Sequence, residues 1–97
     1  MKIKDVKARM SLINLENVEV LSVEEKTIEK LKKKLINVNI KDAEGSEGVF
    51  TMWENKFYDF DIFQVGEHYH ISSCYTKDAF NGVVQIILGK EGRIVQL

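Results

Sequence analysis

Short runs in which apolar and polar residues alternate recur along the sequence, and they favour a fold built mainly from β-strands. In the run at 35–42, LINVNIKD, the residues Ile36, Val38 and Ile40 take every second position. Successive side chains of a strand point to opposite faces, so this period of two gives one apolar and one polar face. We therefore expect a half-buried strand here, with Asn37 and Asn39 on its outer face.

Further strand signals lie before and after this run. At 17–24 the apolar residues change from one strand phase to the other, which indicates a strand bent by a bulge. The Asn81-Gly82 pair predicts the turn of a closing hairpin. The other expected strands are at 48–53, 68–77 and 82–89, and the tail at 92–97 can extend the pairing.

Helical spacing of apolar residues marks two short segments. Within 56–67, Phe57, Phe60 and Phe63 fall roughly on one side of a helix that Gly66 would end. This pattern predicts a short helix between the third and fourth strands, with an aromatic side that plugs the core. Apolar residues at positions 3, 6 and 10 predict a short turn or helix across one end of the fold.

A single domain is expected to occupy residues 1–97. The chain has 97 residues and no proline, and it is 44% hydrophobic and 30% charged, as is typical of a small globular domain. A chain of this length buries only about two thirds of the surface that its unfolded form exposes. Most aliphatic residues are therefore needed for one core, which leaves few for function.

The cysteine content points to a reducing compartment. Cys74 is the only cysteine, which excludes an internal disulfide and a zinc site made of several thiolates. The first ten residues, MKIKDVKARM, lack the apolar segment of a signal peptide, and no apolar run approaches the ~20 residues that span a bilayer. We expect a soluble, cytoplasmic protein with no membrane partner.

Charge is segregated along the chain, although the net charge is only −1. Residues 26–34 carry five lysines against Glu29, whereas residues 41–70 carry two lysines and seven carboxylates. Proteins that bind phosphates normally show an excess of basic residues, so the net charge alone argues against a strongly basic nucleic-acid binder. The distribution of charge is more informative than its sum.

Several short motifs occur in an order and spacing that resemble one known family. They are Ile3, Asp5, Val6 and Met10; Asp42 with Gly45; Thr51-Met52-Trp53; Val65-Gly66-Glu67; Phe80-Asn81-Gly82; and Gly89-Lys90 followed by Arg93-Ile94. Together they resemble the OB-fold domains of the archaeal and eukaryotic replication protein A family over nearly the whole chain. Ala8 and Arg9 replace the Pro-Gly pair of that family, and the turn near Gly45 is one residue longer.

The resemblance implies an all-β, five-stranded OB-fold Greek-key barrel. It also implies binding of single-stranded DNA in replication, repair or recombination, with no cofactor and no chemistry on the DNA. The size is compatible with one module of a longer protein, whose other OB-fold domains or subunits would then be partners. Two alternatives stay open: an OB domain for protein–protein assembly, which the near-neutral charge favours, and RNA binding, which uses the same stacking physics.

Trp53 and Phe80 match the two aromatic residues that stack on successive bases in that family. Every base has a π-face, so stacking on an aromatic ring contributes about 1 to 3 kcal/mol without a sequence code. If Phe50 and Met52 face the core, the adjacent Trp53 points outward unless a bulge interrupts the strand. The alternatives are that Trp53 caps the barrel end beneath a loop, and that Phe80 folds back over its hairpin.

The remaining candidates for nucleic-acid binding are polar or basic. Outward strand positions offer hydrogen-bonding groups, and the lysine-rich stretch corresponds to a loop that flanks the groove in OB-folds. The alternative for all of them is an ordinary solvated surface. These candidates are Thr51, Asn37, Asn39, Gln85, Lys26, Lys30, Lys32, Lys77, Lys90 and Arg93, of which the last three match basic positions of the family pattern.

Other kinds of site have little support in the sequence. His68 and His70 lack an evident third metal ligand. Asp59 and Asp61 resemble the start of a calcium loop, but Phe63 occupies the next ligand position. The sequence has no Walker-type glycine loop and no nucleophile elbow, so we expect neither a metal site nor an enzyme.

Overall fold

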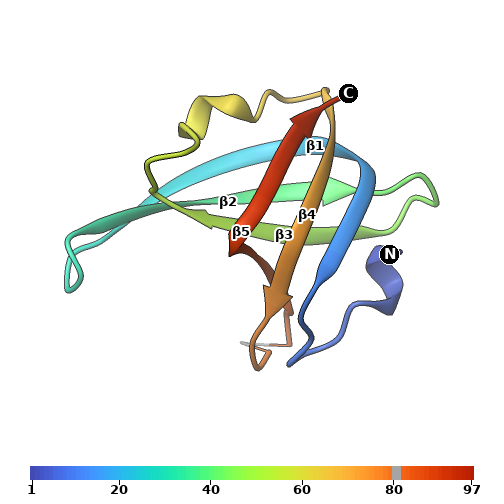
Figure 1. Cartoon of the computed structure of the whole chain (residues 1–97), viewed down its shortest axis with the longest axis horizontal. Coiled ribbons are helices and arrows are strands. Elements are labelled where there is room, and N and C mark those ends of the chain that lie inside the picture. The colour runs from blue at the N-terminus through green and yellow to red at the C-terminus, as the bar shows by residue number, and fades with distance from the viewer. Residues whose placement is uncertain (80–81) are drawn as a thin grey trace.

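The computed structural model of the chain describes residues 1–79 and 82–97. Its strands form a closed barrel in the order β1-β2-β3-β5-β4 (Figure 1). This confirms the expected all-β, five-stranded architecture. The elements are η1 Ile3–Asp5, β1 Ile13–Ile28, β2 Lys33–Lys41, β3 Glu47–Trp53, η2 Phe60–Ile62, β4 His68–Thr76 and β5 Gln85–Gln96, where η denotes a 3₁₀ turn.

The barrel closes because β1 is shared between two neighbours and β5 runs parallel to β3. One part of β1 pairs with β4 and the other with β2, and a register shift between Val20 and Ser22 confirms the expected bulge. The strand is longer at both ends than the expected 17–24. The expected strand at 82–89 and the tail at 92–97 prove to be one continuous strand, which pairs antiparallel with β4.

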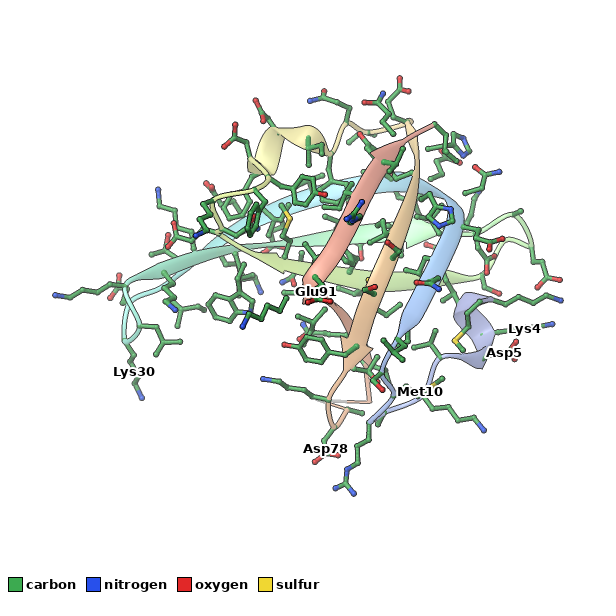
Figure 2. All side chains as sticks on the ribbon, viewed as in Figure 1. Lys4, Asp5, Met10, Lys30, Asp78 and Glu91 are labelled. Atoms are coloured by element: carbon green, nitrogen blue, oxygen red, sulfur yellow. The ribbon has the colours of Figure 1, made fainter. Side chains whose placement is uncertain are left out.

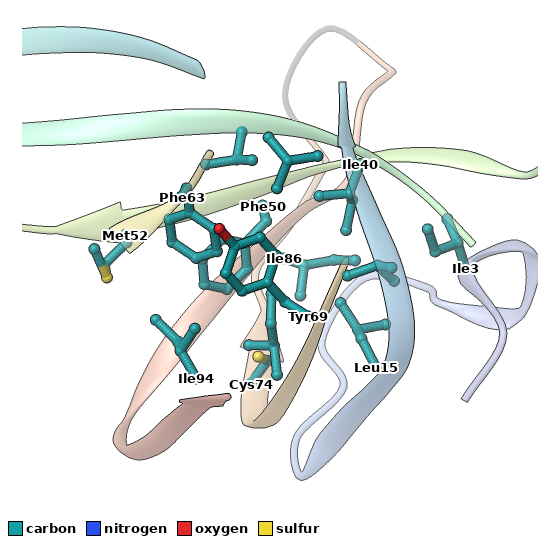
Figure 3. Close-up of a cluster of buried hydrophobic side chains, with 14 of the residues drawn as sticks. Ile3, Leu15, Ile40, Phe50, Met52, Phe63, Tyr69, Cys74, Ile86 and Ile94 are labelled. Atoms are coloured by element: carbon teal, nitrogen blue, oxygen red, sulfur yellow. The ribbon is translucent and has the colours of Figure 1, made fainter. Parts of the chain in front are cut away.

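The core is filled from the inward-facing positions of every strand. Phe50 and Met52, which the strand phase places on one face, are both fully buried. The Phe50 and Phe63 ring centroids are 5.5 Å apart, and those of Phe63 and Tyr69 are 5.1 Å apart (Figure 3). These tilted aromatic contacts stabilise the barrel beyond the area that they bury.

The helix expected within 56–67 is reduced to the three-residue turn η2. Side chains take up the backbone groups that a longer helix would need: the Tyr69 hydroxyl donates to the Ile62 carbonyl at 2.6 Å and accepts from the Gln64 N–H at 2.8 Å. The expected aromatic plug is therefore only partly formed. Phe63 is 4% exposed and fills the core, whereas Phe57 is 71% exposed and does not.

The first residues form the short turn η1, as expected. Arg9, which follows this turn, has an unusual backbone conformation. Its φ is 60°, in the left-handed region that favours glycine. This is the position at which the resembling family has the glycine of its Pro-Gly pair. The Arg9 guanidinium forms an ion pair with Asp78, which joins this segment to the start of the β4–β5 connection and raises the pKa of Arg9.

Asp42 fastens the N-terminal segment to the turn between β2 and β3. The Ile3 N–H donates to Asp42 Oδ2 at 3.0 Å, and the N–H groups of Glu44 and Ser46 donate to Oδ1 at 3.0 Å. Burial alone would raise the pKa of Asp42, but these three donors outweigh it and lower the pKa below its ordinary value.

Asp42→Asn is expected to lower the free energy of unfolding by about 1 kcal/mol at neutral pH, because charge-assisted hydrogen bonds are replaced by neutral ones. Since the folded pKa lies below the unfolded one, the stabilisation by the carboxylate is complete above the unfolded pKa of about 3.9. It is lost as the pH falls through the folded pKa. Urea unfolding of both proteins at neutral and acidic pH checks this, and a difference in stability that grows on acidification would contradict it.

Two features are absent from residues 1–79 and 82–97: a membrane-spanning helix and a cluster of metal-binding side chains. Across those residues, no helix is long and apolar enough to cross a membrane. The same part of the chain has no cluster of three or more His, Cys, Asp or Glu residues that could hold a metal ion. Burial raises the pKa of the Cys74 thiol to about 12, so this thiol stays protonated and unreactive at neutral pH.

Candidate functional site

The outer face of β2, β3, β5 and β4 brings distant residues into a row across the barrel wall. Asn37 lies opposite Thr51, and Thr51 lies opposite Ile87 on the parallel strand. Ile87 in turn lies opposite Tyr75. Because directly opposed residues share a face of the sheet, these four side chains form one transverse row.

Two further rows flank this one on the same face. On one side Leu35 lies opposite Trp53. On the other side Val49 lies between Asn39 and Gln85. The pairing therefore gathers on one continuous face the five strand candidates expected from sequence, which are Trp53, Thr51, Asn37, Asn39 and Gln85.

Trp53 lies at the end of β3 and lines a hollow of about 260 Å³, which we call the Trp53 hollow. Tyr75, Ile87 and Lys90 are among its other lining residues. The indole is partly exposed and is not among the buried core residues. Its outward position follows from strand parity, since the pairing of β2 with β3 contains no register shift between Leu35 and Lys41.

The loop after β3 forms one rim of the Trp53 hollow and is ordered by Asn55. The Asn55 amide donates to the Trp53 carbonyl at 3.0 Å. Its oxygen accepts from the N–H groups of Phe57 at 2.8 Å and Tyr58 at 2.9 Å. The Tyr58 hydroxyl accepts from the Ile94 N–H at 3.2 Å, which connects the loop to β5. These bonds fix the rim relative to the barrel.

Tyr75 is a lining residue that strand alternation alone did not place on this face. The pairing of β4 with β5 shifts register between Ser72 and Cys74, and Ser73 has a φ of 58°. This bulge changes the strand phase, so that Cys74 is buried while Tyr75 faces outward beside Ile87. A glycine within the facing strand, Gly89, is a sequence signal that indicates such a close approach.

The position of Thr51 in the structure differs from the expectation based on sequence. Thr51 was expected to offer a hydrogen-bonding group to a ligand from an outward strand position, yet the residue is only 4% exposed. Its hydroxyl donates to Asn37 Oδ1 at 2.7 Å and so orients that amide. Asn39 and Gln85 are exposed, and the Asn39 amide donates to Ser22 Oγ at 2.7 Å.

The basic candidates fall into separate groups. Lys90 lines the Trp53 hollow, and Lys90 and Arg93 together line a second hollow beside it. Lys77 is exposed and lines a shallow depression with Arg9.

The three lysine candidates of the β1–β2 hairpin do not line the Trp53 hollow. Lys26, Lys30 and Lys32 are exposed, and Lys30 lies at the tip of a hairpin that projects beyond the barrel (Figure 2). Lys26 also pairs with Glu24 at 3.7 Å. Contact of these lysines with the same ligand as Trp53 therefore requires an extended ligand.

Two residues of the predicted β4–β5 turn, Phe80 and Asn81, lie outside the described residues. The stacking role expected for Phe80 and the turn expected at Asn81-Gly82 stay predictions. Gly82 itself has a φ of 76°, in the range that turns use glycine to reach.

Solved structures of similar fold identify the barrel type. No protein-family model matches the chain, and no curated protein matches it. The OB domain of a Methanosarcina mazei protein aligns with a TM-score of 0.75 and 25% identity, over 100% of this chain and 82% of that one. The OB domain of a Thermoplasma acidophilum protein aligns with a TM-score of 0.70 and 16% identity, over 100% and 85%.

A replication factor A related protein from Methanobacterium thermoautotrophicum is also similar in structure. It aligns with a TM-score of 0.68 and 20% identity, over 100% of this chain and 89% of that one. The strand order, the parallel closure of β3 on β5 and these alignments agree. The chain is therefore an OB-fold domain.

Proposed function

We propose that this OB domain binds single-stranded DNA without strong sequence preference, as part of replication, repair or recombination, and performs no reaction on it. The observation that carries the proposal is the partly exposed Trp53, which lines an open hollow with Tyr75, Ile87 and Lys90. The similarity in fold to a replication factor A related protein supports the same proposal.

The residues of the Trp53 hollow suit an unpaired nucleotide because they offer two kinds of contact. The rings of Trp53 and Tyr75 can stack on the faces of bases whatever the sequence, and Ile87 adds apolar contact. Lys90 supplies a cation for the phosphate that accompanies a base, and Arg93 lies in the neighbouring hollow. A base in a duplex keeps its faces stacked on its neighbours and cannot use the rings in this way.

Binding by one such domain should be modest and sensitive to salt. A single OB-fold covers about 4 to 16 nucleotides, and part of its affinity comes from the release of counterions by its basic residues. The net charge of −1 limits this electrostatic part. We therefore expect stacking to carry a large share of the affinity, so that substitution of Trp53 is more damaging than substitution of any one lysine.

The test follows the fluorescence anisotropy of labelled oligo(dT) on titration with the protein at low salt. Trp53→Ala should weaken binding by about 5-fold to about 150-fold, because stacking contributes about 1 to 3 kcal/mol. Trp53→Phe should retain most of the affinity, since it keeps an aromatic face. Val65→Ala is the matched control, because Val65 is 66% exposed and does not line the Trp53 hollow.

Other ligands separate the proposal from its alternatives. Duplex DNA should compete poorly with oligo(dT). An oligo(U) that binds as tightly as oligo(dT) would extend the ligand to single-stranded nucleic acid in general. If oligo(dT) does not bind at low salt and the protein associates with itself or with other OB domains, the domain serves assembly and the proposal is wrong.

A further inference from the structure

We infer that Phe57 is an additional stacking platform, and that a bound single strand continues from the Trp53 hollow across this ring toward Arg93. This inference rests on the proposed function and specifies the path of the ligand. Phe57 is not one of the two residues expected from sequence to stack on bases, which are Trp53 and Phe80. The added contact lies between the loop after β3 and the second half of β5.

Phe57 is a large apolar side chain that contributes little to the fold. It is 71% exposed, although Phe60 and Phe63 in the same segment pack against or within the core. Single exposed apolar residues are common on protein surfaces, so exposure alone assigns no role. The surroundings of Phe57 carry the inference.

The backbone at Phe57 is ordered by side-chain hydrogen bonds. Asn55 Oδ1 accepts the N–H groups of both Phe57 and Tyr58, while the Asn55 amide bonds to the Trp53 carbonyl. One asparagine thus ties the backbone of Phe57 to that of Trp53. A ring on such a segment loses less conformational entropy on stacking than a ring on a loose loop, because the backbone order already exists.

Phe57 lies between two hollows of different character. It lines the Trp53 hollow and also the second hollow, which is lined by Lys90 and Arg93 among others and has a volume of about 700 Å³. A strand that leaves the Trp53 hollow can therefore meet an aromatic face and then basic side chains. This alternation of ring and cation matches the alternation of base and phosphate.

The charges around Phe57 also favour an anionic polymer. Lys56 Nζ is 5.7 Å from the centroid of the Phe57 ring. Lys90 and Arg93 line the hollows on either side, against the carboxylates of Glu54 and Glu91. The linings of the two hollows thus carry two cations and two anions, and Lys56 adds a third cation beside the Phe57 ring.

The test measures affinity for oligo(dT) of increasing length, from about 4 to about 16 nucleotides, by anisotropy. Phe57→Ala should weaken binding of the longer oligonucleotides by about fivefold or more, and it should affect the shortest ones much less. Phe57→Tyr should restore the affinity for long oligonucleotides. Val65→Ala, which removes a comparably exposed apolar side chain elsewhere, should leave it unchanged.

A second measurement uses the unsubstituted protein. On addition of oligo(dT), backbone amide NMR signals of Phe57 and Gly92 should shift together with that of Trp53, since all three residues line the Trp53 hollow. Shifts at Trp53 and at Leu31, in the β1–β2 hairpin, without shifts at Phe57 and Gly92 would overturn the inference, because the strand would then run along the hairpin.

The failure of this inference can be told apart from the failure of the proposed function. If the protein binds oligo(dT) and Trp53→Ala weakens binding, but Phe57→Ala binds as wild type at every length, Phe57 is not a platform and the proposed function stands. If the wild-type protein binds no oligo(dT) of any length at low salt, the proposed function is wrong and the inference fails with it.

Discussion

Gly89→Ala should lower the free energy of unfolding by about 3 kcal/mol, near the upper end for overpacking in a well-packed region. A Cβ atom at Gly89 would lie 2.2 Å from the carbonyl oxygen of Ser73 and 4.0 Å from a ring carbon of Tyr75. The first contact is with backbone, so β4 and β5 would have to separate at the bulge. A flexible side chain could move aside at much lower cost.

The same separation should disturb the Trp53 hollow, because Tyr75, Gly89 and Lys90 all line it. Gly89→Ala is therefore also expected to weaken oligo(dT) binding at temperatures where the variant is still folded. Urea unfolding measures the stability, and anisotropy measures the affinity. Both effects come from one displaced strand pair.

Gly48→Ala is the matched control for Gly89→Ala. A Cβ at Gly48 would lie 3.0 Å from the Ile3 Cγ2 methyl group, which belongs to a side chain and can shift. Its destabilisation should be well below that of Gly89→Ala. Equal destabilisation by the two substitutions would show that the close approach of Gly89 to Ser73 does not account for the loss of stability in Gly89→Ala.

Phe50→Ala should lower the free energy of unfolding by about 3 to 5 kcal/mol, the range for loss of a buried phenylalanine. Phe50 is fully buried and its ring packs against Phe63, which in turn packs against Tyr69. Removal of the ring leaves a cavity among side chains from three separate elements, which cannot collapse together easily. Chemical denaturation followed by circular dichroism measures the loss.

Phe57→Ala provides the comparison for Phe50→Ala, since the same atoms are removed from a side chain that is 71% exposed. Surface substitutions of this kind change stability by at most about 0.5 kcal/mol. The two variants should therefore have different effects. Phe50→Ala should lose stability, whereas Phe57→Ala should lose affinity for long oligonucleotides. A comparable loss of stability in both would mean that Phe57 packs in solution more closely than its exposure indicates.

Strand alternation made much of the barrel predictable from sequence. The phase of the third strand put Phe50 and Met52 on one face and Trp53 on the other, and the structure buries the first two and leaves Trp53 partly exposed. The outward position of Asn37 was predicted by the same reasoning. These predictions succeed because the direction of successive side chains is a local property of an extended backbone and needs no knowledge of distant contacts.

Features that depend on distant partners were not predictable in this way. Tyr75 faces outward because of the bulge at Ser73, whose N–H is accepted by Asn14 and whose carbonyl is approached by Gly89. Thr51 is buried although its strand position is outward, and it lies between Asn37 and Ile87 of the neighbouring strands. No local sequence pattern indicates which residues of other strands will lie opposite a given residue.

In the segment after β3 as well, distant partners decided a feature that the local sequence pattern did not predict. Its phenylalanine spacing indicated a helix, but Asn55 and Tyr69 bind the backbone groups that such a helix would use. The sequence by itself determined the strands and the separation of Trp53 from Phe50 and Met52 on opposite faces, because backbone sterics act between adjacent residues. Tertiary structure alone decided which side chains share the Trp53 hollow, because closure of the barrel joins residues that are far apart along the chain.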